Sequence, residues 1–174
     1  GFHAHFSRAT LVDSLFRENL RGAQFQESRV VIEDCRFLDN GNGVQFRDSR
    51  VRLDRVVIAG GQWGLRCVYS EVEMNACRIE DNLVNGVNLR DSKLAARGNR
   101  ITGNRRGLYL QRSEGAVAGN DLSGNSEHGI FLEDSSFEVV DNRLGGNGRA
   151  GVRWLNGSGR LVRNLIVDNG VYAL

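Results

Sequence analysis

Residues 99–113 read NRITGNRRGLYLQRS and contain most of a unit that recurs along the whole chain. In this unit a glycine precedes apolar residues at alternate positions, as in Gly107-Leu108-Tyr109-Leu110, and a serine follows six residues after the glycine. A fixed repeat of this length predicts a solenoid. The glycine recurs at steps of 21 or 22 residues, at Gly1, Gly22, Gly43, Gly64, Gly86, Gly107, Gly129 and Gly151.

The repeat changes its length at one place only. Three residues lead from Asn40 to Gly43, whereas four lead from Asn82 to Gly86. This corner is therefore expected to be a loop, and the rest of each unit is expected to pair with its neighbours. Runs such as Val87-Asn88-Leu89 alternate with a period of two, which indicates β-strands rather than helices.

These observations predict an all-β fold, a right-handed, single-stranded parallel β-helix with about eight coils of 21–22 residues and three short strands per coil. At about 4.8 Å between paired strands, such a rod is about 38 Å long. The chain contains no proline, as expected where each strand needs ladder donors on both sides. We expect one domain over residues 1–174, a segment of a longer solenoid or a rod that stacks end to end.

Two columns of apolar residues are expected to fill the interior, and asparagine and glycine are expected to supply left-handed corners. One corner column holds stacked asparagines in the later repeats, which predicts a buried amide ladder; the earlier repeats place small or apolar residues there. The ladder column is Ser14, Cys35, Val56, Cys77, Asn99, Asn120, Asn142 and Asn164. At the two ends, Phe2 and Ala4 are expected to face one opening, and Trp154, Leu161, Ile166 and Leu174 the other.

Composition excludes several classes of function. The net charge of +2 gives no electrostatic reason to bind nucleic acid, and the apolar runs are too short for membrane insertion. Cys35 and Cys77 lie two coils apart, too far for a disulfide, so three buried free thiols are expected. We expect no metal site and no cofactor.

The repeats Asn99–Asn104 and Gly107–Ser113 resemble those of the pectate-lyase-like superfamily, which includes carbohydrate-binding proteins and sugar hydrolases. The resemblance covers the whole chain and implies a polysaccharide ligand and a periplasmic, cell-surface or extracellular location. It does not fix an activity, since this scaffold carries lyases, hydrolases, epimerases, tailspikes and binding modules. The Asn-Thr-Asp, Asp-Asp and Gly-His-Gly motifs of the polygalacturonase-like members are missing, and the nearest fragment is Glu127-His128-Gly129. The Asp-Pro-His-Asp of alginate-epimerase-like members is missing as well.

The outward face of the strand after each glycine is the candidate sugar-contact surface, because aromatic rings flanked by amides and guanidiniums suit sugar rings and their carboxylates. The alternative is that these side chains only stabilise neighbouring strands. The candidate residues are Trp63, Arg66, Asn88, Arg90, Arg106, Tyr109, His128, Phe131 and Glu133. Asp48, Asp91 and Asp134 each precede the recurrent serine, a pattern typical of turns rather than of catalytic acids.

The leading hypothesis is a non-catalytic β-helix module that acts as a rigid binding or scaffold rod for polysaccharide in the cell envelope. One alternative is a fragment of a polysaccharide lyase, glycoside hydrolase or C5-epimerase whose catalytic loops lie outside this segment. Another is a structural spike or assembly segment. Charged columns such as Arg29, Arg50, Glu71, Lys93 and Glu114, and Arg52 above Glu73, are interpreted as cross-strand pairs that fix the register.

Overall fold

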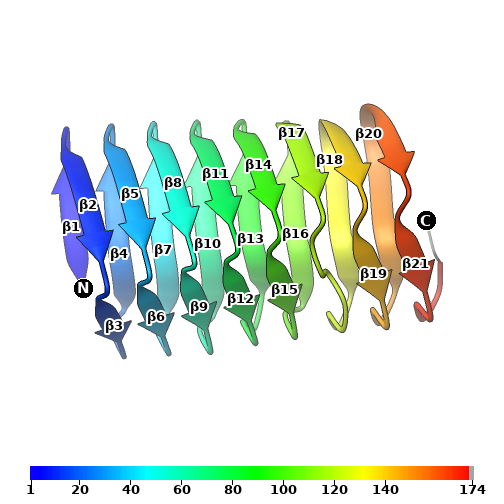
Figure 1. Cartoon of the computed structure of the whole chain (residues 1–174), viewed down its shortest axis with the longest axis horizontal. Helices are drawn as coiled ribbons and strands as arrows, with labels where there is room; N and C mark the ends of the chain where they lie inside the picture. The colour runs from blue at the N-terminus through cyan, green and yellow to red at the C-terminus, as the bar shows by residue number, and fades with distance from the viewer. Residues whose placement is uncertain (173–174) are drawn as a thin grey trace.

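The computed structural model describes residues 1–172, which form twenty-one β-strands and no helix. The strands wind in about eight turns into a rod, with the two ends of the chain at opposite ends (Figure 1). Each strand pairs in parallel with the strand one turn later, as Leu65 does with Val87. No helix in these residues is long and apolar enough to cross a membrane.

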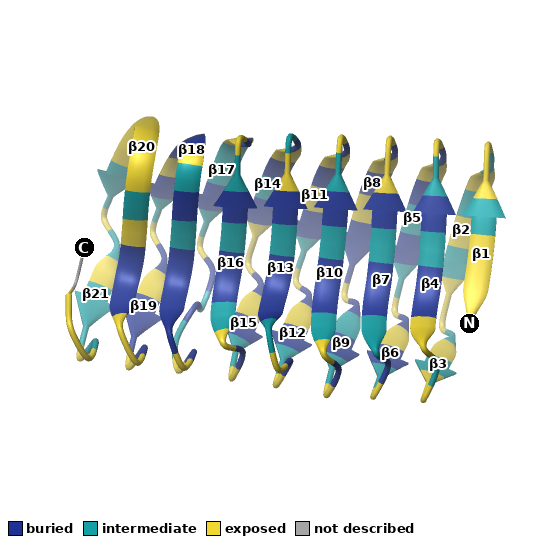
Figure 2. Cartoon of the chain, turned by 180° about the vertical axis from the view of Figure 1, so that it is seen from behind, coloured by how far each residue is buried: buried dark blue, intermediate teal, exposed yellow. Residues whose placement is uncertain are grey.

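The strands stand in three columns, one on each side of the rod. The first column begins at the recurrent glycine and contains β1 (Phe2–His5), β4 (Arg21–Gln26), β7 (Asn42–Arg47), β10 (Trp63–Val68), β13 (Asn85–Arg90) and β16 (Arg106–Gln111). The second column contains β2 (Arg8–Val12), β5 (Arg29–Glu33), β8 (Arg50–Asp54), β11 (Glu71–Asn75), β14 (Lys93–Arg97) and β17 (Glu114–Ala118). The third contains β3 (Leu15–Arg17), β6 (Arg36–Leu38), β9 (Val57–Ala59), β12 (Arg78–Glu80), β15 (Arg100–Thr102), β19 (Arg143–Gly145) and β21 (Leu165–Val167). Figure 2 shows the first column from behind the view of Figure 1, where the second column faces the reader.

The last turns depart from the three-strand pattern. The first and second strands join into single long strands, β18 (His128–Val140) and β20 (Ala150–Val162), because their ladder continues around the corner through Ser135 and Gly157. In the turn before them, Asp121 makes only isolated bridges in the third column. The three-strand prediction therefore holds for the first five turns and is modified after them.

The interior consists of stacked columns of like residues, as the repeat predicted. Phe25 lies 5.2 Å from Phe46 between ring centroids, and Phe16 lies 4.7 Å from Phe37. Residues at the C-terminal end are less covered: Trp154, Leu161 and Ile166 are partly buried, whereas their counterparts one turn earlier are fully buried. Leu174 lies outside the described residues.

The predicted amide ladder is present at the corner between the second and third columns. Asn99 Nδ2 donates to Asn120 Oδ1 over 2.8 Å, and Asn120 Nδ2 donates to Asn142 Oδ1 over 3.0 Å. The last rung runs from Asn142 to Asn164 over 3.0 Å. Each amide thereby ties one turn to the next inside the rod.

Two further ladders were not predicted. A second column of amides closes the corner after the third strand, where Asn82 Nδ2 donates to Asn104 Oδ1 over 2.9 Å. At the corner after the first strand, each serine hydroxyl accepts the backbone N–H of the serine one turn earlier, as Ser49 Oγ does from Ser28 over 3.1 Å. Polar side chains thus close the other two corners along most of the rod, and the corner between the second and third columns in its later turns.

Glycine supplies left-handed corners as expected, for example at Gly98 and Gly119, but the expectation that asparagine does so is wrong. Within residues 1–172 only Asn156 is an asparagine with positive φ, and the left-handed residue stands directly before the ladder residue. Gly98, with a φ of 61°, precedes Asn99, and Asp48, Asp91 and Asp134 precede their serines in the same conformation. The backbone turns at one residue so that the next can point its side chain inward.

The three cysteines are buried and free, as predicted. Burial raises the pKa of the Cys77 thiol to about 11, despite nearby backbone hydrogen bonds that lower it. Burial also raises the pKa values of Cys35 and Cys67. All three thiols are therefore protonated at neutral pH and pack as small apolar groups.

Candidate functional site

The candidate surface is an outward row along the first column of strands. Parallel pairing places Tyr109 of β16, Phe131 of β18 and Arg153 of β20 in register, one above the other. Arg66 and Asn88 continue the same row toward the N-terminus. Because in-register side chains on one face are neighbours, these five residues form a continuous strip, which we call the aromatic strip.

Phe131 is the centre of the aromatic strip. Its ring lies 5.2 Å from that of Tyr109, with the two planes tilted by 43°. The guanidinium carbon of Arg153 lies 5.0 Å from the ring centroid, and that of Arg106 lies 5.5 Å from it. Cation–π contacts of this kind contribute roughly 0.5–2 kcal/mol each. The cluster therefore presents a half-exposed ring between two positive charges.

Glu127 neutralises the edge of this cluster. Its carboxylate accepts hydrogen bonds from Arg105 over 3.0 Å and from Arg106 over 2.9 Å, and Arg149 lies 3.8 Å away. Burial alone would raise the pKa of Glu127, but the guanidiniums of Arg105 and Arg106 hold it below its ordinary value. A carboxylate buried in this way fixes the position of Arg106 beside Phe131 and Tyr109.

Glu133 lies on the other side of the rings. Tyr109 Oη donates to Glu133 Oε2 over 2.7 Å, and Gln111 Nε2 donates to the same oxygen over 3.2 Å. Burial and the hydrogen bond to Glu133 both raise the pKa of Tyr109, so the phenol keeps its proton at neutral pH. One carboxylate oxygen of Glu133 is left to accept from a ligand hydroxyl.

His128 is placed differently from the prediction, which put it on the surface. It is only 3% exposed and packs edge-on against Phe131, with 5.5 Å between ring centroids. Burial, followed by the charge of Arg153, lowers the pKa of His128, so the ring is neutral near pH 7. Its Nδ1 is buried without a hydrogen-bond partner within the described residues. The histidine therefore supports Phe131 from below instead of contacting solvent.

Seven of the nine predicted residues fall into two groups. Arg106, Tyr109, His128, Phe131 and Glu133 form the connected cluster described above. Trp63 and Arg66 make a separate pair, with the guanidinium carbon 4.8 Å from the indole centroid. Asn88 lies in the strip between the two groups, and exposed Arg90 turns toward Asp91 at 3.6 Å.

Sequence reasoning left out Glu127, Arg105, Arg149 and Arg153. Arg153 lies in the predicted column, at the same repeat position as Tyr109 and Phe131. A signal for Glu127 exists in the sequence, because Arg105, Glu127 and Arg149 occupy one repeat position with alternating charge. Such alternation at the loop corner indicates an ion pair that spans three turns.

The acidic residues before the serines have a structural role in the turns. Asp91 accepts two hydrogen bonds from Arg112, at 2.8 and 3.1 Å, and this pairing lowers the pKa of its carboxyl group. Residues 1–172 contain no group of three metal-ligating side chains. The expected pair between Arg52 and Glu73 is wrong, because Arg52 binds the buried Asp54 at 2.6 Å on its own strand.

The sequence profile of the right-handed β-helix region matches residues 7–171, and no curated protein sequence matches the chain. Among solved structures, a point mutant of the periplasmic alginate epimerase AlgG is similar over 93% of this chain and 50% of its own, with 19% identity and a TM-score of 0.76. AlgG itself is similar over the same shares, with 17% identity and a TM-score of 0.66. The chain thus spans about half the length of the proteins it resembles, and the likeness concerns the fold.

Proposed function

Because the chain belongs to the right-handed β-helix family, we propose that it is a rigid, non-catalytic rod that binds an acidic polysaccharide along the aromatic strip. The family gives the fold and the handedness expected from the repeat. The ligand and its place are inferred from the chemistry of the strip. The proposal includes a location in the periplasm or outside the cell. The similar fold of a mutant of the periplasmic protein AlgG supports this location.

The observation that carries the proposal is the ring of Phe131 between Arg106 and Arg153. An aromatic face offers a sugar ring an apolar platform, and a guanidinium binds a carboxylate through two parallel hydrogen bonds. A uronate carries both features one bond apart. Arg153 is exposed and forms no ion pair with a carboxylate in the described chain, so it is free to take a ligand carboxylate.

The direction of the strip suits a linear ligand. Successive members stand about 4.8 Å apart along the rod. The strip contains a charged, an amide, two aromatic and a second charged side chain, in the order Arg66, Asn88, Tyr109, Phe131 and Arg153. A chain laid along the axis meets one of them at each turn. The rod is prearranged by its ladders, so little ordering entropy opposes binding.

A second candidate function is a fragment of a uronan epimerase or lyase. The pair of Tyr109 and Glu133 favours it, because a protonated phenol at 2.7 Å from a carboxylate is a possible proton donor beside a bound sugar. The test is incubation of the chain with alginate oligomers, followed by proton NMR of the sugar. We expect no change at C5 and no chain cleavage; turnover that is lost in Tyr109→Phe would replace the binding proposal by this one.

Titration calorimetry tests the binding proposal directly. Oligomers of mannuronate, guluronate and galacturonate serve as acidic probes, and a glucose oligomer serves as the neutral one. We expect Phe131→Ala and Arg153→Gln each to weaken acidic binding by about tenfold, the loss of one good aromatic or charged contact.

Gln24→Ala is the matched control, because Gln24 occupies the same repeat position in an early turn, where its in-register neighbours are His3 and Gln45 and no phenylalanine or tyrosine. It should bind as the unaltered chain does. Equal affinity in Phe131→Ala, or equal binding of the glucose oligomer, would contradict the proposal.

A further inference from the structure

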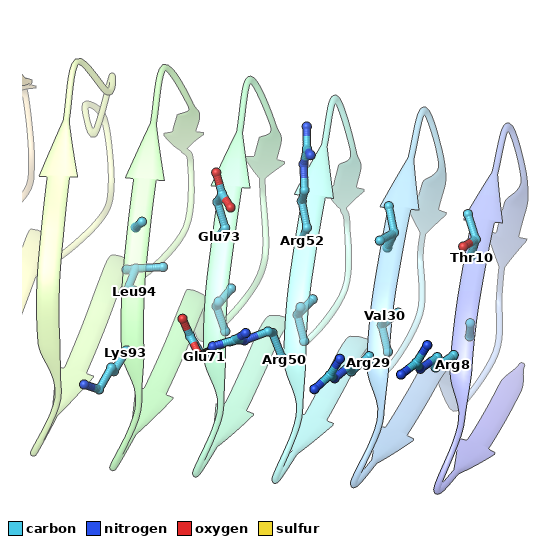
Figure 3. Close-up of a pocket in the computed structure, with 15 residues that line it drawn as sticks. Arg8, Thr10, Arg29, Val30, Arg50, Arg52, Glu71, Glu73, Lys93 and Leu94 are labelled. Atoms are coloured by element: carbon cyan, nitrogen blue, oxygen red, sulfur yellow. Dashed lines mark hydrogen bonds and ion pairs between the residues drawn. The ribbon is translucent and has the colours of Figure 1, made fainter.

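The second column of strands, on the other side of the rod from the aromatic strip, contains a groove. It runs over β2, β5, β8, β11 and β14 and encloses about 710 Å³ (Figure 3). The outward-facing side chains of its floor include Thr10, Val31 and Ala95, and basic side chains stand along one edge. The function proposed above does not use this surface.

Three arginines stand in register at the N-terminal end of this groove. Arg8 pairs with Arg29 across β2 and β5, and Arg29 pairs with Arg50 across β5 and β8. Figure 3 shows their side chains along the same edge of the column. We call these three residues the arginine ladder.

The arginine ladder departs from the alternation expected of this column. From Arg50 onward the charges do alternate: Arg50 binds Glu71 at 2.5 Å, and Lys93 binds Glu114 at 2.7 Å. Arg8 and Arg29 are exposed and form no ion pair within residues 1–172. Like charges directly opposite each other on neighbouring strands destabilise a sheet, so the free protein carries an unfavourable arrangement here that a bound anion would relieve.

The residues around the arginine ladder indicate which class of anion it can bind. The paired strands that bear these arginines stand about 4.8 Å apart along the axis, which suits a row of carboxylates better than one isolated anion. The groove lining contains no aromatic side chain on which a nucleic-acid base could stack. Glu71, which is bound to Arg50, and Glu73 end the row of positive charge at β8, so the site is centred on Arg8 and Arg29.

We propose that the arginine ladder binds the carboxylates of a linear acidic polysaccharide lying along the rod. A polyuronate has one carboxylate on every sugar, and the guanidiniums of Arg8 and Arg29 can each hold one through paired hydrogen bonds. The guanidinium of Arg50 is bound to Glu71 and adds its positive charge at the end of the row. The outward-facing side chains of Thr10 and Val31 contact the sugar rings from below. Since the aromatic strip lies on another side of the rod, one molecule can hold two polysaccharide chains at once.

The experiment uses the full chain with Phe131→Ala and Arg153→Gln already introduced, so that only the second surface is measured. Galacturonate oligomers are titrated at low salt, with a neutral glucose oligomer and a single-stranded DNA oligomer in parallel. We expect galacturonate binding that weakens as salt rises. Adding Arg29→Glu should weaken it by at least about tenfold, since two charge-assisted contacts are lost.

Arg36→Glu is the matched control. Arg36 is an exposed arginine without an ion pair in the described chain, but its in-register neighbours Leu15 and Val57 are uncharged. It makes the same change in net charge and should leave binding within about twofold.

The melting temperature of the ligand-free protein provides a second readout. Arg29→Glu should raise it at low salt by relieving repulsion with Arg8 and Arg50, while Arg36→Glu should not. No galacturonate binding, equal losses in both variants, or tighter binding of DNA than of galacturonate would overturn the proposal.

Discussion

The corner between the second and third strands is closed in two ways along one rod. In the early turns it holds Cys35, Val56 and Cys77, all buried and apolar in character. In the later turns Asn99 and Asn120 occupy the same position and join their amides. The backbone of the two halves is nearly the same, with a left-handed residue before each of these positions.

Cys77 is the last of the apolar residues at this corner, and the amide ladder begins one turn later at Asn99. Cys77 Sγ lies 3.5 Å from the carbonyl oxygen of Leu53, and one turn later Asn99 Nδ2 donates to the carbonyl of Met74 over 3.0 Å. Leu53 and Met74 are in register, so the thiol stands where the ladder would place an amide. The corner therefore needs a small side chain that faces a carbonyl; the amide adds a directed link between turns.

The largest effect on this comparison is expected from Asn120→Leu. The change removes the acceptor of the Asn99 backbone N–H and the donor to the Ala96 carbonyl, both inside the rod. A buried group without its partner costs about 1–3 kcal/mol, so we expect a loss of about 3 kcal/mol in the free energy of unfolding. Urea denaturation measures it.

Asn88→Leu is the control for that loss, because Asn88 is half-exposed on the first column. It should change the free energy of unfolding by less than about 0.5 kcal/mol. An unchanged urea midpoint in Asn120→Leu would show that the ladder does not stabilise the later half.

A smaller effect, of opposite sign, is expected from Cys77→Asn. The new amide can donate to the Leu53 carbonyl and to Asn99 Oδ1, which already accepts the backbone N–H of residue 77. It extends the ladder by one rung, and we expect a gain of up to about 1 kcal/mol. The reverse change, Asn99→Cys, should lower stability, and a loss in both variants would mean that the two halves are not interchangeable.

The repeat made the fold predictable because each turn places the same residue types in the same environment. The interior columns, the buried thiols and the ladder of Asn99 to Asn164 follow from their spacing alone. The second amide ladder lies in an equally regular column, with Asn82 and Asn104 among its members, but asparagine at a corner is equally typical of a left-handed backbone turn. Spacing does not reveal which of two adjacent corner residues turns the backbone.

The sequence predicts which residues of the candidate site stand in one column, but it does not predict which partners their side chains contact. The register placed Tyr109 beside Phe131, and the structure has them so. Which way a long side chain leans is decided by its neighbours: Arg106 is held by Glu127, and Arg52 turns to Asp54 instead of Glu73. Burial of His128 depends in the same way on the side chains around it.

A crystal structure of the chain with a mannuronate tetrasaccharide tests the proposed function most directly. We predict a sugar ring on the face of Phe131, with a carboxylate bound by Arg153 or Arg106. The early turns of the same column, at Gln24 and Gln45, serve as the internal comparison and should be free of sugar. A tetrasaccharide bound at Gln24 and Gln45, or a first column without sugar while the ligand saturates the crystal, would contradict the assignment of the aromatic strip.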